Sequence, residues 1–239
     1  MKKHSLFKFF IVSCIFIIIP CKGYGLDITL GGTAWYSWWD FDRSMRTIDI
    51  DPAFLYGPVL SVKLNENFNF TFAYLYGKFD YRNKESGNGK ISRSDSDLAL
   101  NYRLNDYLKI FAGIKYMAFA EPGFDHGCYG PGLGLSSTVP LPIVENLFFV
   151  GNLSGFYLWG DEEKFQGTVK SDCREYGVNS TLSLAYYIAT ASTVITFGGR
   201  LQYFKTDYGD SVDESGNPTS NIKHMFYGIT LTATYTFSF

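Results

Sequence analysis

The C-terminal segment Tyr227-Gly-Ile-Thr-Leu-Thr-Ala-Thr-Tyr-Thr-Phe-Ser-Phe239 alternates between apolar and small polar side chains. A period of two places successive side chains on opposite faces of a β-strand. One face of this strand is therefore apolar, and the other consists of Thr, Gly and Ser. A soluble sheet would carry more Lys and Glu on its polar face. The segment is typical of a strand that lies between lipid and the polar interior of a barrel.

The same alternation recurs upstream in segments of about ten residues, the length that a tilted strand needs to cross a bilayer. Their apolar residues fall within 28–38, 54–64, 68–76, 98–104, 108–116, 133–139, 147–159, 176–186 and 195–203. The sequence therefore predicts an all-β fold, a transmembrane antiparallel up-and-down barrel of ten strands, with eight or twelve strands as alternatives. A soluble β-sandwich or a lipocalin-like barrel is the competing interpretation.

The segments between these strands alternate in length, as expected for a barrel with short periplasmic turns and long extracellular loops. The expected short turns are 65–67, 105–106, 140–146 and 187–192. The expected loops, rich in charged and small polar residues, are 40–51, 81–92, 120–127, 160–172 and 206–223. This arrangement leaves both ends of the barrel domain in the periplasm.

Residues 1–25 differ from the rest of the chain. Lys2, Lys3 and Lys8 precede an apolar run that extends from Phe9 to Pro20, and Gly25 follows this run. This pattern predicts a secretory signal peptide cleaved after Gly25, because the apolar run is shorter than the roughly 20 residues of a spanning helix. We therefore expect one barrel domain at 26–239. A lipoprotein signal that uses Cys21 is the alternative.

Composition supports this class of protein. Aromatic residues make up 18% of the chain, yet the mean hydropathy is only −0.04, as expected when lipid-facing and interior residues alternate. Without residues 1–25, the 21 basic residues fall to 17 while all 23 acidic residues remain, so the formal net charge changes from −2 to −6. An acidic chain without a basic stripe predicts no binding to nucleic acid.

Two stretches carry a resemblance to known proteins. The aromatic ending at Tyr235, Phe237 and Phe239 resembles the terminal signature of bacterial outer-membrane proteins, and 95–116 resembles a hairpin of the small opacity and OmpA-like barrels. The resemblance implies export to the cell outer membrane of a Gram-negative bacterium. It also implies contact with outer-membrane lipid and lipopolysaccharide, and recognition of the last strand by the barrel-assembly machinery.

Charged residues at inward positions are the main candidates for function in the lumen. They are Lys63, Asp95, Asp97, Arg103, Lys109, Lys115, Glu175 and Arg200. If opposite charges pair across the lumen, they form a plug; if they line a gap, they form a narrow path for ions or solutes. A ten-stranded barrel is only slightly wider than eight-stranded barrels, which side chains nearly fill, so a plugged or very narrow interior is favoured.

The four tryptophans fit two roles. Aromatic girdles at the membrane interfaces account for all four, Trp35, Trp38, Trp39 and Trp159. Trp35 and Trp39 share the inward face of the first strand, so an aromatic ligand site in the lumen is the alternative for these two residues.

Cys128 and Cys173 remain after removal of the signal peptide. We expect them at the ends of the third and fourth long loops. A disulfide between them can form in the oxidising periplasm, and two unpaired thiols are the alternative. Two cysteines are too few ligands for a zinc site, so the sequence predicts no metal and no other cofactor.

An enzymatic role is the weakest interpretation. The neighbours Asp125 and His126, with Asp207 and Asp210, superficially suit an omptin-like protease, but the surrounding pattern does not match. A lipid-modifying barrel needs a Ser activated by His, and His224 has no such motif around it. We expect a structural or surface-interaction barrel that acts through its extracellular loops, with a porin-like passive channel for small solutes or ions as the alternative.

Overall fold

The computed structural model describes residues 27–42, 48–83, 87–164, 169–208 and 221–238. The expected signal peptide and Phe239 lie outside these residues. The described strands are β1 (Asp27–Asp42), β2 (Ile48–Ile50), β3 (Ala53–Lys63), β4 (Phe68–Asn83), β5 (Gly87–Arg103), β6 (Leu108–Glu121), β7 (Phe124–Pro140), β8 (Leu147–Lys164), β9 (Val169–Ile188), β10 (Thr193–Asp207) and β11 (Ile222–Ser238). A short 3-10 turn, Ala189–Ala191, connects β9 and β10.

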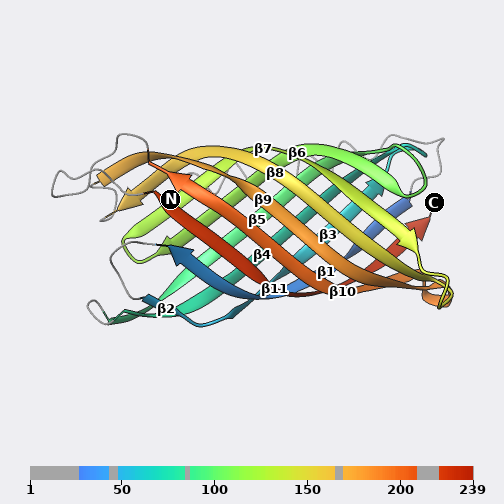
Figure 1. Cartoon of the computed structure of the whole chain (residues 1–239), viewed down its shortest axis with the longest axis horizontal. Helices are drawn as coiled ribbons and strands as arrows, with labels where there is room; N and C mark the ends of the chain where they lie inside the picture. Colours follow the sequence, from blue (N-terminus) through green and yellow to red (C-terminus); the bar gives the residue numbers. More distant parts are fainter. Residues whose placement is uncertain (1–26, 43–47, 84–86, 165–168, 209–220, 239) are drawn as a thin grey trace.

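These strands form a closed antiparallel barrel (Figure 1). Each long strand pairs with the next one along the chain, and β11 pairs with β1 from Asp27↔Ser238 to Asp42↔Lys223. The short strand β2 pairs with β4 alone, beyond the end of β3. Ten strands therefore build the wall of the barrel, which confirms the predicted fold and strand number.

The alternation in the sequence separates the two faces of the wall as predicted. Outward apolar side chains such as Leu133 and Phe54 are 66% and 62% exposed, whereas the inward side chains of Trp35 and Leu55 are fully buried. Aromatic and aliphatic side chains thus cover the outside of the barrel, the face that is suited to lipid. Within the described ranges, no helix is long and apolar enough to cross a membrane.

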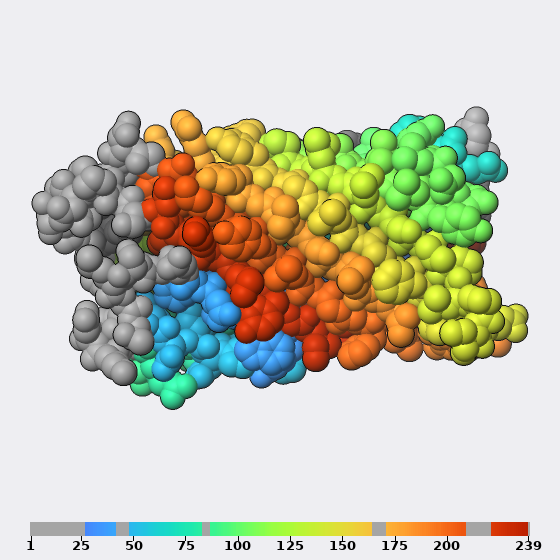
Figure 2. All heavy atoms as spheres, viewed as in Figure 1, coloured from blue at the N-terminus to red at the C-terminus, as the bar shows by residue number. Residues whose placement is uncertain are grey.

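One end of the barrel, which we call the inner end, carries the short connections, the start of β1 and the end of β11 (right in Figures 1 and 2). Two of the turns at this end have the same hydrogen-bond pattern. Asn65 accepts hydrogen bonds from the backbone N–H groups of Asn67 and Phe68, each 2.9 Å long. Asn105 does the same for Tyr107 and Leu108. An Asn side chain that binds the backbone two residues on is a common turn signal, which explains why these turns are short.

The outer end differs from the prediction, because three of the expected long loops are paired strands. The β4–β5 ladder continues to Asn83↔Gly87, the β6–β7 ladder to Glu121↔Phe124 and the β8–β9 ladder to Lys164↔Val169. Beyond a membrane the outward side chains of a strand meet water and are polar, even where its inward side chains stay buried. The apolar alternation therefore fades there, although the backbone pairing continues.

Two facing glycines in the inner half of the barrel allow a prediction. Gly113 and Gly132 are register partners in β6 and β7. A Cβ atom on Gly113 would lie 2.0 Å from the carbonyl oxygen of Leu98, whereas one on Gly132 would lie 3.6 Å from that of Gly155. We expect Gly113→Ala to lower the free energy of unfolding by about 1–3 kcal/mol through overpacking, while Gly132→Ala leaves it unchanged or slightly higher.

Denaturant titration of the refolded barrel measures both glycine variants. Equal stability of the two variants would contradict this description of the wall.

Candidate functional site

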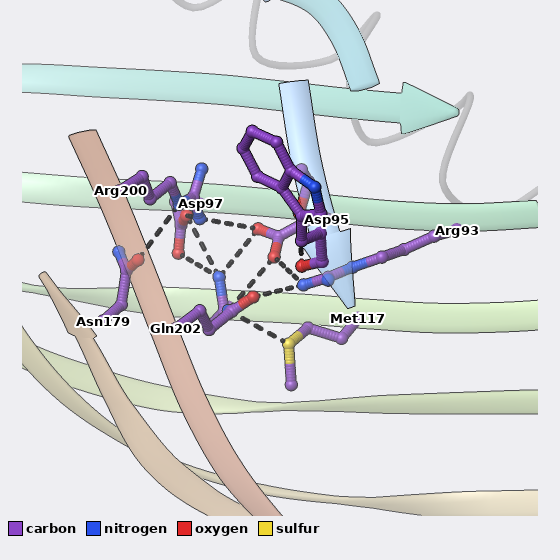
Figure 3. Close-up of polar contacts among 10 residues, drawn as sticks. Arg93, Asp95, Asp97, Met117, Asn179, Arg200 and Gln202 are labelled. Carbon is purple, nitrogen blue, oxygen red and sulfur yellow. Dashed lines mark hydrogen bonds and ion pairs between the residues drawn. The ribbon is translucent and has the colours of Figure 1, made fainter. Parts of the chain in front are cut away.

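An ion cluster lies in the middle of the lumen (Figure 3). Its centre is the carboxylate of Asp95 on β5, which is 2.8 Å from Lys115 Nζ, 3.1 Å from Arg93 Nη2 and 3.5 Å from Arg200 Nη2. Gln202 Nε2 donates a further hydrogen bond of 3.1 Å to Asp95, and Gln202 Oε1 accepts one from Arg93. The side chains of Arg93, Asp95 and Lys115 are at most 4% exposed.

This ion cluster spans the whole barrel. In the closed order of ten strands, β5 and β10 are five positions apart and therefore face each other across the lumen. Asp95 extends from β5, and Arg200 and Gln202 extend from β10 to meet it. Asp97 joins the cluster through Lys115 at 3.0 Å and Arg200 at 3.8 Å. Of the two arrangements that the sequence left open, paired charges and a charged gap, this cluster has the paired one.

The cluster has three cations for two carboxylates, and aromatic rings face the extra charge. The Arg93 guanidinium lies 3.5 Å from the centre of the Phe226 ring, and that of Arg200 lies 4.6 Å from the Trp35 ring. The face of an aromatic ring attracts a cation, more strongly where water is excluded. Among the described residues, Nε and Nη1 of Arg93 have no hydrogen-bond partner, so these rings are the main contact of that side of the guanidinium.

An aromatic plug fills the lumen between the ion cluster and the outer end. It consists of Trp35, Trp39, Phe79, Phe119, Phe204 and Phe226, all at most 8% exposed. The Phe226 ring centre lies 4.9 Å from that of Trp39 and 5.9 Å from that of Phe204. Trp38 and Trp159 are 36% and 45% exposed on the outer face, as expected for a girdle. The girdle prediction is wrong for Trp35 and Trp39, which occupy the inward positions and are buried in the lumen.

A small polar cavity of about 130 Å³ adjoins the ion cluster. Its lining includes Asp97, Asn101, Lys115, Asn152, Ser154 and Asn179. The cavity is large enough for a few waters. From the outer end inward, the lumen therefore contains first the aromatic plug, then the ion cluster and then this cavity.

A second buried polar group surrounds His126 near the outer end of β7. His126 Nδ1 lies 3.3 Å from Glu162 Oε2, and His126 Nε2 lies 3.0 Å from Glu175 Oε1. Thr206 donates a hydrogen bond of 3.0 Å to Glu175, and the Tyr208 hydroxyl donates one of 2.7 Å to Glu162. Burial and the charge of Glu162 raise the pKa of Tyr208 well above its usual value, which keeps the phenol protonated as a donor.

Cys128 and Cys173 belong to the same group, and two expectations about them need correction. They lie on β7 and β9 with their side chains buried in the lumen, not at the ends of loops. Their sulfur atoms are 3.1 Å apart and not bonded. The expectation that they lack further metal ligands is wrong, because His126 Nε2 lies 3.6 Å from Cys128 Sγ. His126, Cys128 and Cys173 present ligand atoms within 4.8 Å of one another.

The remaining predicted charges lie at the inner rim, away from the ion cluster. Lys63 is 3.6 Å from Asp27 and about half exposed, at 51%. Arg103 pairs with Asp106 in the β5–β6 turn. Lys109 is half-buried at the inner end of β6. Five of the eight predicted residues, Asp95, Asp97, Lys115, Glu175 and Arg200, are therefore in the two buried groups.

Three residues of the buried groups, Arg93, Gln202 and Glu162, are not among the predicted ones. Arg93 and Glu162 fall next to or within segments that were expected to be loops, although each has the inward parity of its strand. Gln202 is uncharged and was therefore not predicted. Its position between the outward Leu201 and Tyr203 indicates that its side chain points into the lumen. Asp125 and His126 do not form a couple, because Asp125 is exposed while His126 is buried.

The fold defines the class of protein, a closed antiparallel β-barrel of the transmembrane type. No protein-family model and no curated protein sequence matches the chain. Among solved structures, the translocator domain of the autotransporter NalP from Neisseria meningitidis is similar over 97% of this chain and 95% of its own, with 10% identity and a TM-score of 0.47.

Two further similar structures are the β-domain of the Bordetella autotransporter BrkA and OprG from Pseudomonas aeruginosa. The first covers 91% of this chain and 100% of its own, with 11% identity and a TM-score of 0.43. The second covers 90% and 97%, with 11% identity and a TM-score of 0.36. The similarity to all three structures is one of fold, at sequence identities of 10–11%.

Proposed function

We propose that the chain is an integral outer-membrane barrel with a lumen closed by its own side chains, and that it has a structural or surface-interaction role at its outer end. The observation that carries this proposal is the buried contact between Asp95 on β5 and the Arg200–Gln202 pair on β10, which meet across the full lumen. A solute path would have to break this cluster and displace the aromatic plug.

The outer end supports a role at a surface. Beyond the apolar belt, the outward face of β4 and its neighbours carries ion pairs, with Asp80 2.8 Å from Lys90 and Arg82 2.8 Å from Asp51. These side chains are more than half exposed, from 51% to 66%. Charged side chains on the outward face of this projecting hairpin are suited to water and to polar partners.

Export and assembly complete the proposal. Residues 1–25 act as the signal peptide, and Tyr235, Phe237 and Phe239 act as the signal for the barrel-assembly machinery. Tyr235 and Phe237 are 45% and 42% exposed on the outward face of β11. The apolar belt then contacts outer-membrane lipid, with lipopolysaccharide on the outer side.

A matched pair of substitutions tests membrane insertion. Leu133 is 66% exposed on the outside of β7, and Ile143 is 86% exposed in the β7–β8 turn. In lipid vesicles, we expect Leu133→Arg to lower the free energy of unfolding by about 2–4 kcal/mol, because a charge near the bilayer midplane is costly. Ile143→Arg should change it by no more than about 0.5 kcal/mol.

Tryptophan fluorescence during denaturant titration measures both variants. Equal effects at the two positions would show that the belt around Leu133 does not contact lipid, and would overturn the proposed location.

A further inference from the structure

A glycine on the strand between them allows the two cysteines to approach each other. Cys128 on β7, Gly160 on β8 and Cys173 on β9 are consecutive register partners across three strands. A Cβ atom on Gly160 would lie 1.9 Å from the carbonyl oxygen of Gly127, so a larger residue does not fit without a shift of the backbone. Glycine at this position leaves room for the two sulfur atoms to lie 3.1 Å apart.

The surroundings of the sulfur atoms favour a cation. Glu162 and Glu175 are 2% and 0% exposed and both contact His126, so two carboxylates share one imidazole. Glu175 Oε2 accepts no hydrogen bond from any described residue. A buried carboxylate oxygen is normally paired or bound to a metal, so this oxygen is available as a ligand.

We propose that His126, Cys128 and Cys173, with the carboxylate of Glu175, form a binding site for a thiophilic divalent cation, Zn²⁺ in particular. Zinc bonds of about 2.3 Å to sulfur and about 2.0 Å to nitrogen in a tetrahedron place N and S roughly 3.5 Å apart and two S roughly 3.8 Å apart. The corresponding separations are 3.6 Å for His126–Cys128 and 3.1 Å for Cys128–Cys173. Binding releases the two thiol protons, since thiolate is the ligand, and also the proton that joins His126 Nε2 to Glu175 Oε1.

A disulfide is the rival use of the same sulfur atoms. The strand β8 separates the two cysteines, so two strand spacings, roughly 9–10 Å on a flat sheet, lie between their Cα atoms. Disulfides join Cα atoms that are usually about 4.4–6.8 Å apart. Curvature of the barrel shortens this distance, but a metal bridge between the sulfur atoms requires less movement of the backbone. The adjacent His126 and Glu175 also have a role in a metal site and none in a disulfide.

The test uses the mature barrel, refolded with reductant under anaerobic conditions and titrated with Co²⁺ as a spectroscopic substitute for Zn²⁺. We expect one Co²⁺ per barrel, with a thiolate-to-metal charge-transfer band in the near ultraviolet that Zn²⁺ abolishes by displacement. Cys173→Ser should weaken binding by about tenfold or more and reduce the band. Glu163→Gln is the matched control, because Glu163 neighbours Glu162 but has the outward parity of β8, and it should leave both unchanged.

X-ray absorption at the zinc edge of the wild-type protein makes the test independent of whether Cys173→Ser folds. Two sulfur ligands at about 2.3 Å are expected. A folded, reduced barrel that binds no Co²⁺, or a zinc spectrum without sulfur ligands, would overturn the proposal. So would a protein isolated without reductant in which Cys128 and Cys173 are joined by a disulfide.

Discussion

Replacing Asp95 by Asn is expected to lower the free energy of unfolding by about 3–5 kcal/mol, the usual effect of removing one partner from a buried ion pair. The Asp95 carboxylate is 1% exposed and lies within 3.5 Å of Lys115, Arg93 and Arg200. Asparagine keeps the shape but leaves Asp97 as the carboxylate partner of Lys115 and Arg200, and removes the ion pair of Arg93 with Asp95. Denaturant titration of the refolded barrel gives the difference.

Asp106→Asn is the matched control for Asp95→Asn. Asp106 also pairs with an arginine, Arg103, but its side chain is 76% exposed in an inner turn. Exposed pairs contribute only about 0–1 kcal/mol. If the two substitutions were equally destabilising, the cluster would not be a buried structural element. Combining Asp95→Asn with Arg93→Met should recover part of the loss, which a double-mutant cycle would measure.

Phe226→Ala is expected to lower the free energy of unfolding by about 3–5 kcal/mol, as for other fully buried aromatic residues. The Phe226 ring contacts Trp39 and Phe204, and the Arg93 guanidinium lies 3.5 Å from its centre. Truncation therefore leaves a cavity in the plug and removes the ring that faces Arg93. The loss of packing and the loss of the cation–π contact both lower the free energy of unfolding.

Phe197→Ala is the comparison for Phe226→Ala. Phe197 is 57% exposed on the outward face of β10, where fluid lipid can fill the space that truncation leaves. We expect the free energy of unfolding to fall by at most about 3 kcal/mol, because only the transfer free energy of the side chain from water to lipid is lost. Equal losses for Phe226 and Phe197 in vesicles would contradict a tightly packed plug.

The sequence predicts which face each strand residue occupies, because parity is a local property. The inward positions of Trp35, Lys115 and Arg200 and the outward positions of Trp38 and Leu133 all follow from it. The turns at Asn65 and Asn105 are likewise readable, since their hydrogen bonds join residues two or three apart.

The two buried groups could not be predicted in full, because they depend on ring closure and register. The contact between Asp95 and Gln202 joins residues 107 positions apart on opposite strands. That between Cys128 and Cys173 requires the register of three strands and the absence of a side chain at Gly160. His126 and Glu162 lie in segments whose outward side chains are largely polar, so the apolar alternation does not mark them as strands.

Single-channel recording in a planar bilayer tests the central claim of a closed lumen most directly. The protein is the refolded mature barrel, whose heat-dependent gel shift confirms the folded state before insertion. We expect no discrete openings, because the Asp95 cluster and the aromatic plug fill the lumen. Reproducible openings with an ion selectivity that changes in Lys115→Glu would contradict this account and identify a conducting path through the barrel.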